Sequence, residues 1–262
     1  MKNKIILLLI LTLFMTGCGV IKDTPKPETP VENPKENQTT TNQAISTPDP
    51  IEVEENKVYI GQALDTNEFD GEVEVYDTNS YDGEIIYTLK DYEEVELIET
   101  VPFGWFKVKL EDGTEGYAEA ISIRTEEIPP HEYDKDSSEY VLIFTHENQT
   151  LKIYKNGELA IESLGSSGVW DYFTPRGIFQ IEDSRRGEWS YIERFESGFK
   201  YWVGFRWIYL FHSIIFDKDG NIIEEEAEKL GQPASHGCIR LPVETAKYIY
   251  DNVPVGSIVL IY

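Results

Sequence analysis

The sequence is poor in cysteine and in basic residues, and both shortages narrow what the protein can be. Among 262 residues there are two cysteines, and 23 lysines and arginines stand against 48 aspartates and glutamates, giving a formal net charge of −25. Proteins that bind nucleic acid need a basic face for the phosphate backbone, so this composition excludes that function. An acidic surface also keeps the protein off anionic polymers unless cations bridge the two.

Long apolar runs are also scarce. Ile5–Met15 is mostly apolar, but about eleven residues are too few for a permanent membrane-spanning helix. The run follows Lys2 and Lys4 and ends near Cys18, so residues 1–18 are typical of a signal peptide for export. A cysteine at the cleavage point resembles the bacterial lipoprotein signal, in which that thiol takes a diacylglyceryl group and becomes the mature N-terminus. A plain secretory signal would leave this cysteine unexplained.

Lipidation of Cys18 would leave Cys238 as the sole thiol of the mature chain. No internal disulfide is then possible, and an unpaired cysteine in an exported protein is best explained by chemical reactivity. Residues 19–56 are rich in Pro, Thr, Asn, Glu and Lys and have almost no aromatic residues. Such a segment cannot bury enough apolar surface to fold, so we expect a disordered linker that holds the folded part away from the membrane.

Residues 57–125 have the pattern of a small all-β unit. Short alternating runs are separated by turn signals such as Asp112-Gly113, which predicts a barrel or sandwich. The stretch Gly104–Val108, followed by Asp112-Gly113 and Glu115-Gly116-Tyr117, resembles the bacterial SH3-like domains of cell-wall proteins. That resemblance implies a module that targets the protein to peptidoglycan. Residues 126–138, with two adjacent prolines, are expected to be a linker.

Residues 139–262 are predicted to form a second, mainly β domain with one clear helix. Alternating runs predict strands at 140–144, 150–155, 159–164, 178–181 and 256–261. Val243–Asn252 repeats apolar residues at helical spacing, and Pro242 before it suits the start of a helix. Cys238 is therefore expected in the loop that precedes this helix.

The run from Ser235 to Arg240 surrounds Cys238 with groups that could make its thiol reactive. His236 lies two residues before the sulfur, Arg240 two residues after it, and Gly237 lets the backbone approach a substrate closely. A thiol acts as a nucleophile only as thiolate, so it needs such cationic or donor neighbours. His212 lies upstream, and a cysteine with a histidine in one domain is sufficient for covalent acyl transfer.

Two less specific explanations of Cys238 are a buried structural cysteine and a zinc ligand. The apolar neighbours Ile239 and Leu241 would suit a buried structural cysteine, but that reading does not explain the polar residues on both sides. His212, His236 and Cys238 could also bind zinc, yet zinc ligands usually come as pairs two to four residues apart, and His-Gly-Cys is one residue short. We therefore favour the nucleophile and expect no metal and no cofactor.

The whole second domain resembles the L,D-transpeptidase catalytic domain family. The resemblance includes the opening hairpin, the Thr174-Pro175-Arg176-Gly177 turn, a Trp- and Tyr-rich middle, and the Gly231-Gln232-Pro233-Ala234 segment that leads into Ser-His-Gly-Cys. It implies that Cys238 is the nucleophile and His212 the general base and acid. It further implies that the Ser213 carbonyl orients the imidazole, and that Ser235, His236 and Gly237 shape the loop around the oxyanion site.

The family resemblance also implies the reaction. A peptidoglycan stem tetrapeptide would be cut before its terminal D-alanine through a Cys238 thioester, and a second stem would accept the acyl group to give a 3→3 cross-link. Carbapenems would acylate the same thiol. Arg240, Trp202 and Tyr209 are candidate substrate-binding residues. One departure is that 22 residues separate His212 from Ser235, more than is usual in the family, so we expect residues 217–229 to be an inserted acidic hairpin or lid.

Other functions remain alternatives. Sortases also order His, Cys and Arg, but their cysteine follows a Thr-Leu pair and their arginine lies further on. Papain-like wall hydrolases place the cysteine before the histidine. A wall-binding lipoprotein with a degenerate catalytic domain would lack the Cys, His or Gly, and all are present. We expect the chemistry of residues 139–262 to be separable from residues 57–125, the alternative being that the first module packs over the cleft.

The N-terminal pattern predicts that Cys18 is lipidated and that the protein is anchored to the membrane of the bacterial cell envelope, facing the wall. Metabolic labelling with a fatty acid should mark the wild-type chain and not Cys18→Ser, because the acylated thiol is removed. Equal labelling of the two chains would refute lipidation at this residue.

Overall fold

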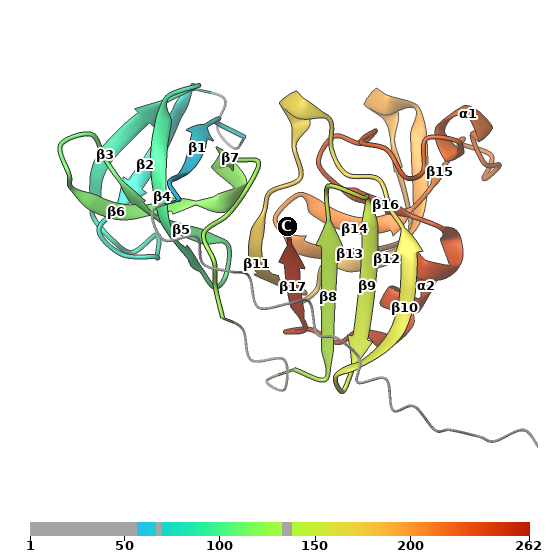
Figure 1. The fold of residues 1–262 in the computed structure, drawn as a ribbon. Coiled ribbons are helices and arrows are strands. Elements are labelled where there is room, and N and C mark those ends of the chain that lie inside the picture. The colour runs from blue at the N-terminus through green and yellow to red at the C-terminus, as the bar shows by residue number, and fades with distance from the viewer. Residues whose placement is uncertain (1–56, 67–69, 133–137) are drawn as a thin grey trace, which may run out of the picture. The chain divides into compact units, whose positions relative to one another are not determined.

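A computed structural model describes residues 57–66, 70–132 and 138–262, and these residues are mainly β (Figure 1). The mainly β fold expected from the sequence is thus confirmed. The predicted signal peptide with Cys18 and the linker 19–56 lie outside the described residues. In the described part of the chain, no helix is long and apolar enough to cross a membrane.

The first of the three sheets in the described residues contains seven strands in the order β3-β2-β6-β5-β4-β1-β7, and each pairing is antiparallel. Its strands alternate buried and exposed side chains, as β4 does, so that one face is apolar. A short 3-10 helix, η1 (Ala120–Ser122), precedes the last strand. The strands are β1 (Tyr59–Ala63), β2 (Glu72–Tyr76), β3 (Ile85–Lys90), β4 (Glu94–Val101), β5 (Trp105–Lys109), β6 (Glu115–Glu119) and β7 (Ile123–Arg124).

The second sheet has the order β10-β9-β8-β17-β11. Its opening hairpin turns at Asn156-Gly157, both with positive φ, as the sequence of a tight hairpin requires. The last strand of the chain lies between β8, to which it is parallel, and β11, to which it is antiparallel. The strands are β8 (Tyr140–Thr145), β9 (Thr150–Lys155), β10 (Glu158–Leu164), β11 (Gly177–Gln180) and β17 (Ile258–Ile261).

The third sheet has the order β12-β13-β14-β16, with β15 paired to β13. The predicted helix is present as α2 (Val243–Asn252), which packs on β13 and β14 and buries Thr245, Ala246 and Ile249. Two further 3-10 helices, η2 (Trp170–Tyr172) and η3 (Glu193–Phe195), lie in loops. The strands are β12 (Arg186–Ile192), β13 (Ser197–Arg206), β14 (Tyr209–Ser213), β15 (Ile215–Phe216) and β16 (Ile239–Leu241).

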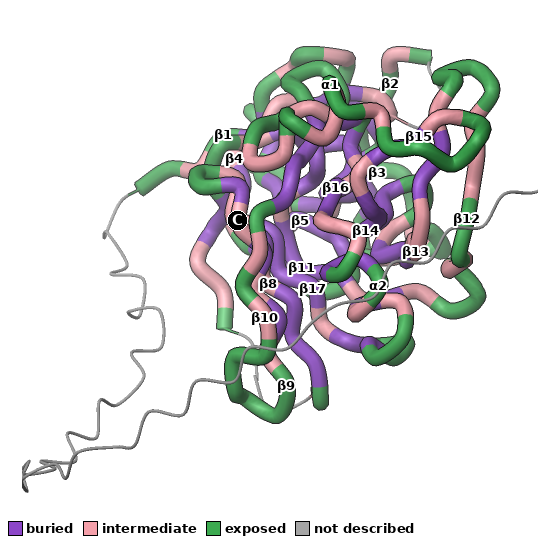
Figure 2. The backbone as a smooth tube through the Cα atoms, turned by 90° about the vertical axis from the view of Figure 1, so that its right-hand side faces the viewer, coloured by how far each residue is buried: buried purple, intermediate pink, exposed green. Residues whose placement is uncertain are grey.

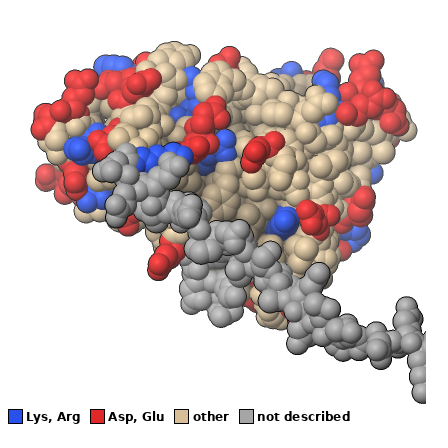
Figure 3. All heavy atoms as spheres, viewed as in Figure 1, with Lys and Arg blue, Asp and Glu red and all other residues tan. Residues whose placement is uncertain are grey.

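The inserted segment 217–229, expected as an acidic hairpin or lid, contains a turn and a short helix. The Asp217 carboxylate accepts hydrogen bonds from the backbone N–H groups of Asp219 and Asn221, both at 2.9 Å. A four-residue helix, α1 (Glu224–Ala227), follows. Figure 3 shows acidic side chains gathered over this region and over the first sheet.

The first sheet shares a hydrophobic core with the other two. One cluster of buried apolar side chains includes Phe106 of β5 and Phe179 of β11. In Figure 2 the buried segments, in purple, gather in the interior of the fold. The backbone N–H of Gly104 donates to the Ile178 carbonyl at 2.8 Å, and Arg176 Nε donates to the Thr125 carbonyl at 2.8 Å. Residues 57–125 therefore pack directly on the second domain, while the alternative that they cover the cleft stays a prediction.

Arg206 of β13 and Glu119 of β6 form an ion pair in this shared region, with side chains only 18% and 7% exposed. The sequence alone gave no reason to pair them, because they lie in different sheets. Removing one partner of such a pair leaves the other charge desolvated and uncompensated, which is costly.

We therefore expect Glu119→Gln to lower the free energy of unfolding by about 2–3 kcal/mol, somewhat less than for a fully buried pair. Glu115→Gln is the matched control, because Glu115 pairs with Lys107 on the exposed side of the same strand and is 48% exposed; it should cost less than about 1 kcal/mol. Urea unfolding of the two variants measures the difference. Equal losses would show that the Arg206–Glu119 pair does not help to hold the sheets together.

Candidate active site

The pairing of two parallel strands fixes where Cys238 and His212 lie along the sheet. Cys238 immediately precedes β16, and β16 pairs with β14 in a register that places Phe211 opposite Ile239 and His212 opposite Arg240. Because matched residues of paired strands point to the same face, His212 and Arg240 share a face of the sheet, and Cys238 lies two positions before Arg240. The register thus sets Cys238 and His212 on the same face of the sheet, two positions apart along the strand pair, and their roles as nucleophile and base stay predictions.

The loop before β16 is held by its own side chains and by a threonine from a distant turn. The Ser235 hydroxyl donates to the carbonyl of Cys238 and accepts from the N–H of Gly237 at 3.1 Å. The Thr174 hydroxyl donates to the Gly237 carbonyl at 2.7 Å and accepts from the N–H of Gly168 at 2.8 Å. The backbone around the thiol is therefore fixed before any substrate arrives.

Two glycines in this loop system are required by close packing. Gly237 has φ +108°, and a Cβ there would lie 2.8 Å from Cε1 of Tyr209. A Cβ on Gly168 would lie 2.9 Å from Cα of Gly237 and 1.9 Å from the Tyr172 carbonyl. Any side chain at either position would push the loop away from Tyr209 and move the Cys238 backbone.

The Cys238 thiol is protonated at neutral pH in this structure. Burial raises the pKa of Cys238 to about 11, against smaller lowering effects from a backbone hydrogen bond and from the charges of Arg240 and Arg185. The thiol donates to the Ile208 carbonyl at 3.5 Å. The sulfur is therefore not a preformed thiolate, and a base has to remove its proton when it attacks.

His212 has the properties of that base. Its side chain is buried and lies against the ring of Phe199, with the centroids 4.4 Å apart. Its Nδ1 lies 2.6 Å from the Ser213 carbonyl, which is the contact that the family resemblance implies for Ser213. An Nδ1–H that donates to this carbonyl leaves the lone pair on Nε2. Burial lowers the pKa of His212 to about 4, so the imidazole is neutral and able to accept a proton at neutral pH.

His236 lies on the exposed side of the same loop. Its ring stacks on Phe195 at 4.7 Å and meets the edge of Tyr172 at 4.8 Å. Burial and the nearby charges of Arg240 and Arg194 lower the pKa of His236. The ring is held by aromatic contacts at the surface, which suits a part in shaping the loop.

Two of the three candidate substrate-binding residues are buried in the structure, and Trp202 is half-buried. Arg240 is 8% exposed and its Nη1 lies 2.7 Å from Glu226 of α1, so it ties the inserted segment to the site. Tyr209 is 3% exposed and lies under Gly237. Trp202 covers Gly187 on the neighbouring strand. Arg240 and Tyr209 are too buried to contact a substrate directly, so we reassign them to support of the loop.

A cavity of about 700 Å³ lies beside the Trp207-Ile208 turn; neither Cys238 nor His212 lines it, and Ile208 is its link to the thiol. Ile208, whose carbonyl accepts from Cys238, lines it together with Trp207 and Arg194, and the first sheet and its loops supply the opposite wall, including Thr66 and Tyr76. Within residues 57–66, 70–132 and 138–262, no three His, Cys, Asp or Glu side chains are grouped to hold a metal ion.

Sequence reasoning missed the residues that position this loop from outside it. Thr174 and Gly168 were not predicted to take part, although the Thr-Pro-Arg-Gly turn was noted as part of the family resemblance. The Ile208 carbonyl could not have been found from sequence, because a backbone oxygen has no residue-type signal. All three become visible only when the loops are packed together.

The buried state of His212 predicts a pH dependence of stability. An unfolded histidine titrates near 6.5 whereas folded His212 has a pKa of about 4, so between these values the unfolded chain binds the extra proton. His212 therefore contributes stability above pH 6.5 that is lost as the pH falls towards 4, reaching about 3 kcal/mol. Urea unfolding at pH 7, 5.5 and 4.5 should show that the free energy of unfolding falls less with decreasing pH in His212→Gln than in the wild-type protein. Parallel curves for the two proteins would contradict the assignment of a buried, neutral His212.

Comparisons with known proteins identify relatives of the second domain. Residues 138–261 match the YkuD family model, described as the L,D-transpeptidase catalytic domain. The Bacillus subtilis (strain 168) protein named "Putative L,D-transpeptidase YciB" is 38% identical over 136 residues, which are 50% of this chain and 70% of that protein.

Two solved structures are also similar. A Clostridium acetobutylicum ATCC 824 protein, described as a fused Zn-dependent amidase/peptidase/peptidoglycan-binding domain-containing protein, is 28% identical with a TM-score of 0.40 over 50% of this chain; the match spans about half of that protein, 55%. The LD transpeptidase LdtMt1, solved in complex with imipenem, is 15% identical with a TM-score of 0.41 over 79% of this chain and 83% of that one. The family model and the Bacillus relative show that the chain belongs to the L,D-transpeptidase catalytic domain family.

Proposed function

We propose that this protein is an exported cysteine L,D-transpeptidase that cross-links peptidoglycan stem peptides through a Cys238 thioester. The observation that carries the proposal is the register that sets a neutral thiol two positions from a buried, neutral histidine on one face of the sheet, with the histidine Nδ1 facing the Ser213 carbonyl. Because both groups are uncharged at rest, His212 is available as the base at the pH at which the thiol is still protonated.

In the first half of the reaction, His212 Nε2 takes the proton from Cys238 as the sulfur attacks the carbonyl carbon between the third residue and the terminal D-alanine. The N–H of Gly237 is already engaged by Ser235, so we assign stabilisation of the oxyanion to the N–H of Cys238, an interaction worth about 3 kcal/mol where such donors have been removed. His212 then gives its proton to the leaving amine. D-alanine departs, and the tripeptide remains on the sulfur as a thioester.

In the second half, the side-chain amine of another stem attacks the thioester carbonyl. His212 takes a proton from that amine, the carbon–sulfur bond breaks, and the thiolate recovers the proton. The products are a new peptide bond between the third residues of two stems, a 3→3 cross-link, and the free enzyme. The cavity beside Ile208 is where we place the reacting stem peptide.

The same attack opens a carbapenem, because the β-lactam carbonyl takes the place of the peptide carbonyl and the ring nitrogen leaves while still tethered. The drug would then stay on Cys238 as an acyl group. The imipenem complex of LdtMt1 concerns that protein; for this chain, acylation of Cys238 is part of the proposal.

The residues before the catalytic domain would hold the enzyme close to peptidoglycan. We propose that residues 57–125 are a bacterial SH3-like domain that binds peptidoglycan, and that Cys18 carries the lipid that anchors the protein in the cell envelope facing the wall. Supporting observations are the seven-stranded antiparallel sheet and the apolar run that precedes Cys18. Nothing in the proposed reaction requires a metal or a cofactor.

Substitution of the reacting pair tests the mechanism. Cys238→Ala should abolish D-alanine release from a tetrapeptide and the mass gain on incubation with a carbapenem. His212→Ala should approach that severity because nucleophile and base act as a unit, whereas His236→Ala should be milder. Muropeptide analysis and intact mass give the readouts. Residual activity of Cys238→Ala within tenfold of wild type would end the thiol mechanism, and a larger loss for His236→Ala than for His212→Ala would exchange the two roles.

A further inference from the structure

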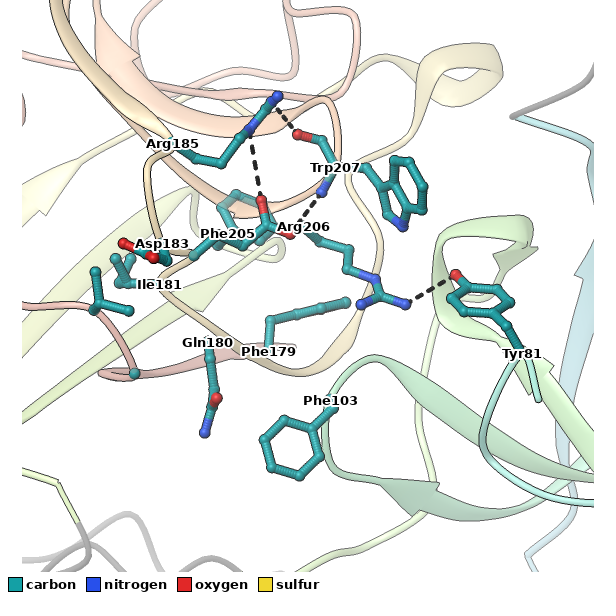
Figure 4. A pocket seen from close by; sticks show the side chains of 13 residues that line it. Tyr81, Phe103, Phe179, Gln180, Ile181, Asp183, Arg185, Phe205, Arg206 and Trp207 are labelled. Carbon is teal, nitrogen blue, oxygen red and sulfur yellow. Dashed lines mark hydrogen bonds and ion pairs between the residues drawn. The ribbon is translucent and has the colours of Figure 1, made fainter. Parts of the chain in front are cut away.

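A second cavity, of about 660 Å³, lies beside the turn that carries Ile208 and is lined by exposed aromatic rings (Figure 4). Tyr81 and Phe103 come from the first sheet and are 49% and 55% exposed; Trp207 comes from the β13–β14 turn and is 53% exposed. Tyr81 and Trp207 also border the cavity in which we place the stem peptide, whereas Phe103 lines only this second cavity. Large aromatic side chains left in water at the edge of one cavity indicate a binding surface.

Two of these rings occupy backbone positions that bulky residues normally avoid. Trp207 is the first residue of a two-residue turn between Arg206 and Tyr209 and has φ +46°. Phe103 lies in the β4–β5 turn and has φ +67°. Gly, Asn or Asp usually takes such positions, because a large side chain is strained there. Two strained, exposed aromatic residues that face the same cavity are better explained by a ligand than by folding.

The rings are also held in place. The N–H of Gly104, next to Phe103, donates to the Ile178 carbonyl at 2.8 Å. The N–H of Trp207 donates to Glu182 at 3.1 Å, and Arg185 donates to the carbonyl of the same residue. Arg206 donates to the Tyr81 hydroxyl at 3.1 Å. The dashed lines in Figure 4 show how this network fixes the turn that carries the tryptophan.

The charges around the cavity nearly balance. Arg206 pairs with Glu119 and Arg185 with Glu182, so the wall offers polar groups that are already neutralised, together with Gln180 and Asp183. An anion would meet arginines that already have carboxylate partners, and of the carboxylates at the cavity Glu119 and Glu182 already have arginine partners. A neutral ligand with flat apolar faces and hydroxyl or amide edges fits such a wall best.

We propose that this cavity binds a saccharide, an N-acetylated amino-sugar glycan whose ring faces stack on Phe103 and Trp207. The C–H faces of a pyranose are apolar and flat, while its hydroxyl groups and acetamide can bond with the planar side chains of Gln180, Glu182 and Asp183. The inference rests on the proposed function, since a stem peptide is attached to a glycan strand. Trp207 adjoins Ile208, whose carbonyl accepts from the thiol, so a sugar held here would keep its stem near Cys238 and raise its effective concentration.

The test uses the full chain and the β-1,4-linked hexamer of N-acetylglucosamine as the probe, with binding measured by isothermal titration calorimetry. Phe103→Asn and Trp207→Asn should each weaken binding at least tenfold. Both variants should keep or raise the melting temperature, because asparagine tolerates positive φ better than an aromatic residue does. Loss of binding without loss of stability separates a missing ligand contact from a misfolded turn.

Tyr92→Asn is the matched control. Tyr92 also has positive φ, +68°, and is 59% exposed, but it does not line this cavity. Its substitution should leave saccharide binding unchanged. Equal weakening in Tyr92→Asn, absence of binding to the wild-type chain, or binding of a Pro-rich peptide of residues 19–56 in place of the saccharide would each overturn the proposal.

A second measurement distinguishes this inference from the proposed function. With a sugar-free tetrapeptide, Phe103→Asn should turn over at the wild-type rate, whereas with a glycan-linked stem its KM should rise at least fivefold with little change in kcat. Saccharide binding that persists in Cys238→Ala, together with activity that also persists there, would sink the thiol mechanism and leave the glycan site standing. An active wild-type enzyme with the same KM for both substrates would sink the glycan site and leave the mechanism standing.

Discussion

The parallel pairing of β14 with β16 is the constraint on which the site depends. It is a crossover connection within a largely antiparallel sheet, and its register places His212 opposite Arg240 and Cys238 just before the pair begins. A shift of one residue would turn His212 to the other face of the sheet, because side chains alternate along a strand. The helix α2, which follows β16 directly and packs on β13 and β14, stabilises this register.

Burial has opposite consequences for the two reacting groups. It raises the pKa of Cys238 and lowers the pKa of His212, so neither group carries charge at rest. This differs from cysteine enzymes in which a nearby cation keeps a thiolate ready. A neutral thiol is less prone to oxidation than a thiolate. In the mechanism that we propose, the proton leaves the thiol during the attack on the carbonyl, and the imidazole accepts it.

The first sheet contributes to the core and to the cavities of the molecule. It shares buried apolar contacts with β11, pairs Glu119 with Arg206, and supplies walls to both cavities that flank the Trp207-Ile208 turn. That turn is the point where the two modules and the nucleophile meet, since its carbonyl accepts from the thiol. The two modules therefore pack on each other, and the expectation that their chemistry is separable stays a prediction.

Local signals in the sequence were sufficient for the β class and the helix at Val243–Asn252, because strand alternation and helical spacing are encoded within a few positions. The residues next to Cys238 suggested a thiol that ionises readily, whereas its burial raises the pKa, and burial is decided by packing. The sequence could not reveal that Arg240 would be buried against Glu226, that Tyr209 would lie under Gly237, or that the Ile208 carbonyl would face the thiol. Those contacts join segments far apart in the chain, and only the packing of the sheets decided them.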